Sequence, residues 1–297
     1  MKLIETILSS ENVIKAQTRV LSNKGGAGID GMHVDELVEY MRANWDNIKE
    51  SILVRKYNPA PVRRVEIPKA NGGVRKLGIP TVLDRTIQQA IVQVLSPIFE
   101  NEFQENSYGF RPCRSCEQAI LKLLEYLNEG YEWIVDIDLE KFFDNVPQDK
   151  LMSYVGRVIR DPDTESLIRK YLKSGVMENG VYEATEEGTP QGGNLSPLLS
   201  NIMLNELDKE LVNRGLHYVR YADDCIIAVG SEASAKRVMR SVTTWIEREL
   251  GLKVNASKSH ICRPTKLKYL GFGFYLNPQN RQWQPRPHES SVSKFVR

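Results

Sequence analysis

Two adjacent aspartates, Asp223 and Asp224, interrupt an otherwise apolar and β-branched stretch at residues 217–229. The flanking sequences VRY and CIIAV are typical of strands, so the stretch predicts two antiparallel strands joined by a tight turn that carries both carboxylates. An ordinary turn is the alternative interpretation, because aspartate suits turns. Like charges held this close repel each other, which favours a bound divalent cation.

A third aspartate, Asp138, ends the aromatic and β-branched segment 131–138. Burying such a strand up to a carboxylate costs free energy unless the carboxylate meets a cation, although a helix cap is the simpler alternative. If this strand lies beside the hairpin, Asp138 and Asp223 converge from distant parts of the sequence. Carboxylates from adjacent strands are what a pair of Mg²⁺ ions about 3.5–4 Å apart requires.

The segments around these aspartates alternate between helix and strand signals. Apolar residues at helical spacing follow four start signals, namely Asp84, Ser115 with Gln118, Ser196–Pro197 and Ser231. Gly251 ends the last of these helices, and short strands are expected at 252–255, 260–262 and 269–275. The order after Tyr131 predicts an α+β fold with a ferredoxin-like antiparallel sheet and helices on one face.

Composition sets broad limits on the class of protein. The chain has 297 residues with 41% hydrophobic and 26% charged side chains, which predicts a soluble protein with one large domain or two. No apolar run approaches the roughly 20 residues of a membrane helix, so we expect a cytoplasmic protein without a membrane partner. Cys113 and Cys116 form a C-x-x-C without a second pair, and we interpret them as ordinary thiols.

Basic residues are concentrated in two stripes although the net charge is only +2. Residues 55–76 contain seven bases and one acid, and residues 253–268 contain five bases and no acid. Such stripes suit contacts with nucleic-acid phosphates, although most charge runs are simply solvated surface. Within the first stripe, the predicted RNA-binding residues are Arg55, Lys56, Arg63 and Arg64.

Several motifs in this order resemble those of reverse transcriptases. They are IPKANGGVRKLGIP at 67–80, SYGFRP at 107–112, DLEKFFD at 138–144, TPQGGNLSPLL at 189–199, YADD at 221–224 and LKYLGF at 267–272. With GIDG at 28–31, the set is most similar to the group II intron-encoded enzymes, also called maturases. The resemblance covers nearly the whole chain and implies a right-hand polymerase with fingers and palm.

The resemblance implies roles for further residues. Two Mg²⁺ ions would bind Asp138, Leu139, Asp223 and Asp224, of which the three aspartates are catalytic. Lys69 and Arg75 would hold the triphosphate of the incoming nucleotide, and Gln191 its sugar or base. Phe143 would stack under the ribose and exclude a 2′-hydroxyl, and Lys258 is a candidate general acid. Tyr269, Leu270 and Gly271 would form the primer grip.

The expected domains follow from the same resemblance. We expect an N-terminal extension and fingers at 1–130, together with part of the palm helices, and a palm at 131–280, with an insert around 145–190 that returns to the fingers. Residues 281–297, rich in proline and glutamine, are expected to be a linker towards a thumb that this chain lacks.

The implied activity is RNA-directed DNA synthesis by transfer of dNTPs to a DNA primer on an RNA template, combined with binding of intron RNA and assistance of splicing. An aromatic residue at 143 argues against an RNA-templated RNA polymerase. A non-intron enzyme, such as a retron-like or diversity-generating reverse transcriptase, stays open, as does an RNA-binding fragment without activity alone. Self-association as a homodimer is a further possibility.

Overall fold

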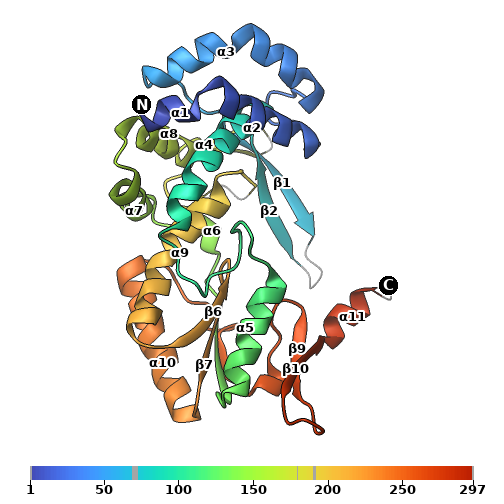
Figure 1. The fold of residues 1–297 in the computed structure, drawn as a ribbon. Helices are drawn as coiled ribbons and strands as arrows, with labels where there is room; N and C mark the ends of the chain where they lie inside the picture. Colours follow the sequence, from blue (N-terminus) through green and yellow to red (C-terminus); the bar gives the residue numbers. More distant parts are fainter. Residues whose placement is uncertain (1, 69–72, 179, 190–191, 296–297) are drawn as a thin grey trace. The chain divides into compact units, whose positions relative to one another are not determined.

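The computed structural model describes residues 2–68, 73–178, 180–189 and 192–295, and its chain divides into two compact units (Figure 1). Unit 1 contains Met1–Glu102 and Phe143–Ile202, and unit 2 contains Phe103–Phe142 and Met203–Arg297. The segment 145–190 groups with the N-terminal region in unit 1, and residues 103–130 group with unit 2.

Unit 1 is mainly helical, with one small sheet. Its helices are α1 (Leu3–Ile7), α2 (Ser10–Ser22), the 3-10 turn η1 (Val34–Glu36), α3 (Leu37–Leu53), α4 (Val82–Glu100), α7 (Gln148–Ile159) and α8 (Pro162–Leu172). The short helix α6 (Phe142–Asn145) lies where the sequence passes from unit 2 to unit 1, and helix α9 (Ser196–Asn213) has residues in both units.

The sheet of unit 1 has the strand order β2-β1-β4-β5. Strand β1 (Val62–Pro68) pairs antiparallel with β2 (Val74–Ile79) and parallel with β4 (Val176–Glu178), which pairs antiparallel with β5 (Val181–Glu183). Because β1 and β4 are distant in the sequence, this pairing ties the two parts of unit 1 together.

The start of helix α4 corrects one prediction. Thr81, not Asp84, is the N-cap, since its hydroxyl accepts a hydrogen bond of 3.0 Å from the Asp84 N–H. Asp84 lies inside the first turn and is 2% exposed. Its carboxylate accepts hydrogen bonds from the hydroxyls of Tyr57 (2.7 Å), Tyr171 (3.2 Å) and Thr81 (2.7 Å), and from the Ala60 N–H (3.1 Å). Sequence patterns cannot show that these tertiary donors make Asp84 a buried anchor.

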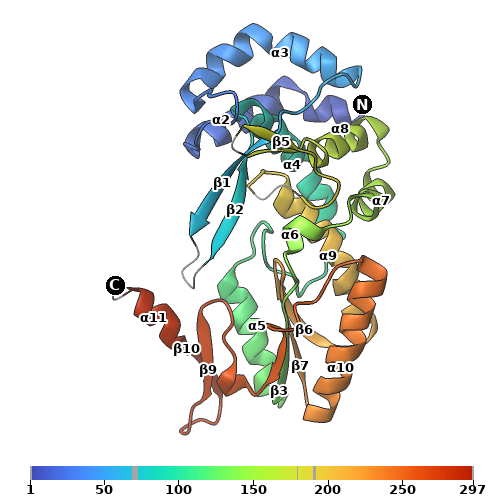
Figure 2. The same cartoon turned by 180° about the vertical axis from the view of Figure 1, so that it is seen from behind.

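Unit 2 is built on a four-stranded antiparallel sheet with the order β6-β7-β3-β8 (Figure 2). The strands are β3 (Trp133–Ile137), β6 (His217–Tyr221), β7 (Asp224–Val229) and β8 (His260–Cys262). Helix α9 lies between β3 and β6 in the sequence, and α10 (Glu232–Trp245) lies between β7 and β8. This βαββαβ order confirms the ferredoxin-like prediction.

Helices cover both faces of this sheet, and not one face as the sequence analysis predicted. Helix α5 (Cys116–Asn128) buries Leu123 and Leu127 against Ile134, Ile226 and neighbouring core residues. Figures 1 and 2 agree that α10 lies on the other side of the sheet from α5. The burial of α5 in this core explains why residues 103–130 belong to unit 2. The predicted capping box of α5 is confirmed at Ser115 and Gln118.

The end of the chain differs from the expected linker. Strand β9 (Phe272–Leu276) pairs antiparallel with β10 (Trp283–Pro287), and helix α11 (Glu289–Phe295) follows. The Trp283 side chain packs against the α5 core, and the backbone N–H of Trp283 donates a hydrogen bond of 2.7 Å to the Asn128 side-chain oxygen. Proline and glutamine disfavour a strand in isolation, but this partner strand and core stabilise one here.

The remaining elements of unit 2 are short. Helix α10 continues into a π-helical turn, η2 (Ile246–Leu250), which ends at Gly251 with a φ of +70°. A 3-10 turn, η3 (Pro264–Lys266), precedes β9. The strand expected at 252–255 is reduced to a single bridge between Val254 and Leu139. Among the described residues, no helix combines the length and apolar character needed to cross a bilayer.

We predict that Asp84→Ala lowers the free energy of unfolding by about 3 kcal/mol, because it leaves several buried donors without an acceptor. Urea denaturation measures this change. Asp46→Ala, at an exposed position of helix α3, serves as the control and changes stability by less than about 0.5 kcal/mol. Equal effects of the two substitutions would contradict the anchoring role of Asp84.

Candidate functional site

The pairing of β3 with β7 brings the predicted metal-binding aspartates together. Ile137 lies opposite Cys225 at the end of the ladder, so the next residues along the two strands are Asp138 and Asp224. Side chains alternate between the faces of a sheet, which places Asp136, Asp138 and Asp224 on the same face. Asp223 adjoins Asp224 in the turn between β6 and β7.

These carboxylates act on one another electrostatically. Burial, together with the negative charges of Asp223, Asp136 and Asp138, raises the pKa of Asp224 to about 6, while Lys258 opposes the shift. The Lys258 ammonium lies 3.4 Å from the nearer carboxylate oxygen of Asp138. The structure therefore brings Lys258 to the aspartates and leaves an excess of negative charge around Asp224.

Asp136 is a member of this cluster that the sequence analysis missed. Its pKa is raised to about 6, mainly by burial; His260 opposes this shift, and the charge of Asp138 adds to it. The His260 Nδ1 atom lies 3.8 Å from the Asp136 carboxylate, across the β3–β8 pairing. The signal for Asp136 was its position two residues before Asp138 in one strand, which predicts a shared face.

The backbone at Leu139 faces the aspartates rather than the neighbouring loop. The Asp138 carbonyl accepts a hydrogen bond of 2.8 Å from the Asn255 N–H, and the Glu140 N–H donates one of 2.8 Å to the Lys253 carbonyl. In such a bridge the intervening residue, Leu139, turns its own N–H and carbonyl away from the paired segment. The Leu139 carbonyl oxygen is therefore directed towards the β7 side, where Asp224 lies.

The donor set fits a divalent cation of the hard type. Carboxylate and carbonyl oxygens are the ligands that such ions prefer, and the repulsion around Asp224 would be relieved by a positive ion. Among the described residues, no three His, Cys, Asp or Glu side chains are gathered closely enough to form a ready metal site. Side-chain adjustment at the aspartates would accompany metal binding.

The turn that carries Asp223 and Asp224 is held in a strained conformation. Ala222 has a φ of +56°, a left-handed value that costs free energy for a residue with a Cβ. Gly109 of the SYGFRP motif lies directly against it, because a Cβ on Gly109 would overlap the Ala222 backbone nitrogen. The SYGFRP motif is thus in close contact with the backbone of the turn.

A buried arginine holds the same turn from the other side. Arg220 and Asp208 are both fully buried and form a bidentate ion pair with distances of 2.6 and 2.8 Å. The remaining donors of Arg220 bond the Ala222 carbonyl (2.7 Å) and the Ser107 hydroxyl (2.7 Å). The sequence analysis did not single out Arg220 or Asp208, since only the fold brings α9 to this strand.

The predicted primer grip forms a tight turn. The Tyr269 and Phe272 backbones exchange two hydrogen bonds of 2.9 Å, and the two intervening residues, Leu270 and Gly271, have φ values of +49° and +87°. The Tyr269 ring is 2% exposed and packs into the α5 core. Only the turn itself is therefore available to a ligand.

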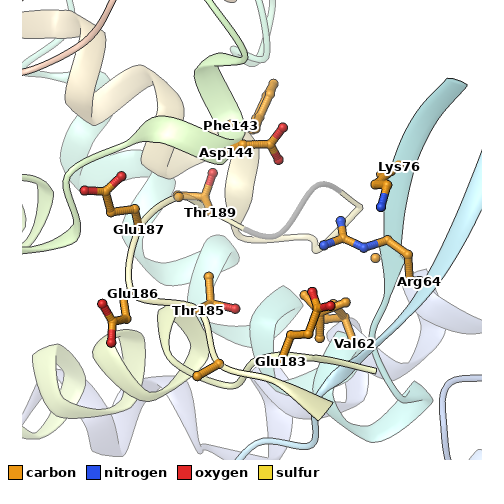
Figure 3. Close-up of a pocket in the computed structure, with 14 residues that line it drawn as sticks. Val62, Arg64, Lys76, Phe143, Asp144, Glu183, Thr185, Glu186, Glu187 and Thr189 are labelled. Carbon is orange, nitrogen blue, oxygen red and sulfur yellow. The ribbon is translucent and has the colours of Figure 1, made fainter. Parts of the chain in front are cut away.

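Unit 1 contains a pocket of about 260 Å³ beside Phe143 (Figure 3). Figure 3 shows Arg64 and Lys76 approaching it from strands β1 and β2. The acidic residues that line the other sides are Asp144, Glu183, Glu186 and Glu187. Because acids outnumber bases here, this pocket by itself does not suit a triphosphate.

Phe143 is fixed by the loop before the TPQGG motif. The Thr189 N–H donates a hydrogen bond of 2.6 Å to the Phe143 carbonyl, and the Gly188 N–H donates one of 2.8 Å to the Val146 carbonyl. Gly188 has a φ of +86°, and a Cβ there would lie 2.7 Å from the carbonyl oxygens of Phe143 and Asp144. The loop can approach α6 this closely only because residue 188 is glycine.

The other predicted nucleotide contacts are Lys69, Arg75 and Gln191. Lys69 and Gln191 lie outside the described residues. Arg75 is exposed and lies in β2 opposite Ile67 of β1. The Thr189 hydroxyl, which the sequence analysis did not single out, is buried and has no hydrogen-bond partner among the described residues.

Intrachain contacts occupy most of the predicted RNA-binding residues. Arg55 forms an ion pair of 2.6 Å with Asp163, and the Arg63 guanidinium donates two hydrogen bonds, of 2.8 and 3.1 Å, to the Ala27 carbonyl. Arg64 faces Glu178 at 3.7 Å, while Lys56 is exposed. The charge stripe at 55–76 is therefore partly used to hold unit 1 together.

Comparison with known proteins identifies the family. Residues 67–274 match the family described as reverse transcriptase (RNA-dependent DNA polymerase). Protein YkfC of Escherichia coli (strain K12) is 34% identical over 313 residues, which cover 92% of this chain and 81% of that protein. The group II intron-encoded protein LtrA of Lactococcus lactis subsp. cremoris is 31% identical, over 91% of this chain but only 56% of its own length.

A solved structure shares this fold. The structure of apo telomerase from Candida tropicalis matches with a TM-score of 0.59 at 13% identity, over 84% of this chain and 54% of that chain. The antiparallel sheet with its flanking helices is thus the fold of a polymerase palm. The chain belongs to the reverse transcriptase family of RNA-dependent DNA polymerases, and it resembles the group II intron-encoded members over most of its length.

Proposed function

We propose that unit 2 is the palm and unit 1 the fingers of an enzyme that transfers dNTPs to a primer 3′-hydroxyl on an RNA template. The observation that carries this proposal is the register of β3 and β7, which sets Asp138 opposite Asp224 on one face. Asp138, Asp223, Asp224 and the Leu139 carbonyl would hold two Mg²⁺ ions. When bound, these ions would activate the 3′-hydroxyl and stabilise the charge on the leaving pyrophosphate.

Lys258 would act in this chemistry as a general acid. Its ammonium lies 3.4 Å from Asp138, which lets it serve as a proton donor near the leaving group once the aspartates turn to the ions. The loop that carries it is anchored to β3, because the Asp138 N–H donates a hydrogen bond of 3.0 Å to the Ser259 hydroxyl.

The nucleotide would be selected by Phe143. The clamp from Gly188 and Thr189 fixes the Phe143 backbone, which supports a defined place for the ring beside the ribose. Lys69 and Arg75 would hold the triphosphate, and Gln191 with the buried Thr189 hydroxyl would contact the sugar or base. The turn at Leu270 and Gly271 would steady the primer end.

We infer intron RNA as a further partner, with a maturase role in splicing. Support comes from the likeness to LtrA, a group II intron-encoded protein. The protein would then combine DNA synthesis with recognition of a structured RNA.

We predict that Asp223→Asn reduces primer extension on an RNA template with Mg²⁺ and dNTPs by roughly 10³-fold or more, because metal ions supply several kcal/mol of transition-state stabilisation. The melting temperature and the far-ultraviolet circular dichroism spectrum should stay close to those of the wild type. Wild-type extension rates in a folded variant would refute the metal-site assignment.

Replacing Phe143 with valine should relax sugar selection. We expect the ratio of rNTP to dNTP incorporation to rise at least about tenfold, since the smaller side chain leaves room for a 2′-hydroxyl. Single-nucleotide extension with matched rNTP and dNTP measures this ratio, and dNTP incorporation by the same variant is the internal control. An unchanged ratio would mean that another residue excludes ribonucleotides.

Gly109→Ala should displace the turn of Asp223 and Asp224, because the new Cβ collides with the Ala222 backbone. A small misplacement of catalytic groups costs about 10²-fold in rate, so we expect a loss of that order in kcat. Gly230→Ala is the matched control, since its Cβ would meet open space. The proposed contact is disproved if both variants extend primers equally well.

A further inference from the structure

Four arginines line a surface groove of about 490 Å³ in unit 2, at the outer side of helix α10. They are Arg214, Arg237, Arg240 and Arg248, and the other lining residues are Ser241, Thr244 and Trp245. Arg214 directly follows the end of α9 and donates a hydrogen bond of 3.2 Å to the Ser241 hydroxyl of α10. None of these residues belongs to the candidate polymerase site.

The packing of helix α10 keeps the side that carries the arginines exposed to solvent. Helix α10 and the turn after it bury Ala235, Val242 and Ile246, which recur on one side of the helix. The arginines at 237, 240 and 248 recur on the other side and are exposed. From Arg237 to Arg248 the row extends roughly 16 Å along the helix axis, at 1.5 Å per residue.

The groove carries a positive charge that the chain only partly compensates. Within the part of the chain that the structure describes, no acidic residue lines it. Arg214 pairs with the half-buried Glu210 (2.7 Å). Arg248 pairs with its neighbour Glu249 (2.6 Å) at an exposed position, and such an exposed pair stabilises little. Among the described residues, the guanidinium groups of Arg237 and Arg240 have no carboxylate partner.

The mixture of side chains indicates the kind of anion. Arginine forks match phosphate oxygens in bidentate geometry. The hydroxyls of Ser241 and Thr244 donate to the Val238 and Arg240 carbonyls within α10, so the arginines are the donors that the groove offers to such oxygens. The half-buried Trp245 ring offers a surface on which an unpaired base can stack. Phosphates with splayed bases occur together in the loops of a folded RNA.

The groove is separate from the catalytic aspartates. Asp136, Asp138 and Asp224 project from the sheet face that packs on α5, whereas α10 covers the opposite face. An RNA bound along α10 would therefore not occupy the carboxylate site.

We propose that this arginine groove anchors the phosphate backbone of a loop in a structured RNA. The assignment deepens the proposed function, on which it rests for the nature of the partner, by giving RNA recognition a surface apart from the template path. It also explains how the protein can hold RNA although Arg55, Arg63 and Arg64 are engaged within unit 1.

The test is the salt dependence of binding to a stem-loop RNA, measured by fluorescence anisotropy with the full chain. Each lost phosphate contact lowers the slope of log K against log salt by roughly 0.7–0.9. We therefore expect Arg237→Gln with Arg240→Gln to weaken binding and to reduce the slope by about 1.5. The control, Lys15→Gln with Arg169→Gln, removes the same charge from two ion-paired positions of unit 1 and should leave the slope near that of the wild type.

Two arms complete the experiment. A DNA stem-loop of the same sequence should show a smaller difference between the double variant and the wild type; an equal difference would overturn the assignment to RNA. Primer extension by the double variant should match the wild type.

A wild-type slope in the double variant, or an equal loss in the control, would overturn the groove while Asp223-dependent extension leaves the polymerase assignment intact. If the wild-type protein extends no primer but its salt-dependence slope still falls when the groove arginines are replaced, the polymerase assignment would be overturned and the groove would stand.

Discussion

The antiparallel register between β3 and β7 is the constraint on which the site depends. Strands that alternate their side chains place Asp136, Asp138 and Asp224 on one face, and a slip by one residue would turn all the β3 carboxylates to the opposite face. Apolar residues on the same sheet face fix this register, because Ile134 and Ile226 must face the core that α5 completes. Packing of hydrophobic side chains thereby determines where the negative charges gather, and their mutual repulsion makes the site receptive to cations.

Unit 2 maintains this arrangement with contacts that contribute more to position than to stability. The buried pair of Arg220 and Asp208 must offset the cost of removing two charges from water, so it is a weak source of stability. It does hold the Ala222 carbonyl in a turn whose backbone is strained, and Gly109 closes the turn from the other side. Strain of this kind persists only where the surroundings determine the conformation, which is the condition that a metal-binding turn requires.

The sequence predicts most clearly what local patterns encode. The hairpin at 217–229, the strand before Asp138 and the capping box at Ser115 all depend on neighbouring residues, and each is present. What it could not predict depends on partners far away in the chain. Strand β10 forms because β9 and the α5 core are available to Trp283, and Arg220 becomes a support because α9 delivers Asp208. The predicted N-cap of α4 was wrong because the Asp84 side chain instead accepts hydrogen bonds from residues distant in the sequence, such as Tyr57 and Tyr171.

The same distinction applies to charge. A run of bases in the sequence, such as 55–76, indicates a phosphate surface only if the fold leaves the side chains unpaired, and here Arg63 and Arg64 turn to groups within unit 1. The arginines of α10 are spread over a helix among acidic neighbours, so no run marks them in the sequence. Helical spacing separates them from most of those acids and aligns them with Arg214, which comes from another helix. A nearly neutral chain can thus present a concentrated positive surface, because the fold and not the composition decides which charges are neighbours.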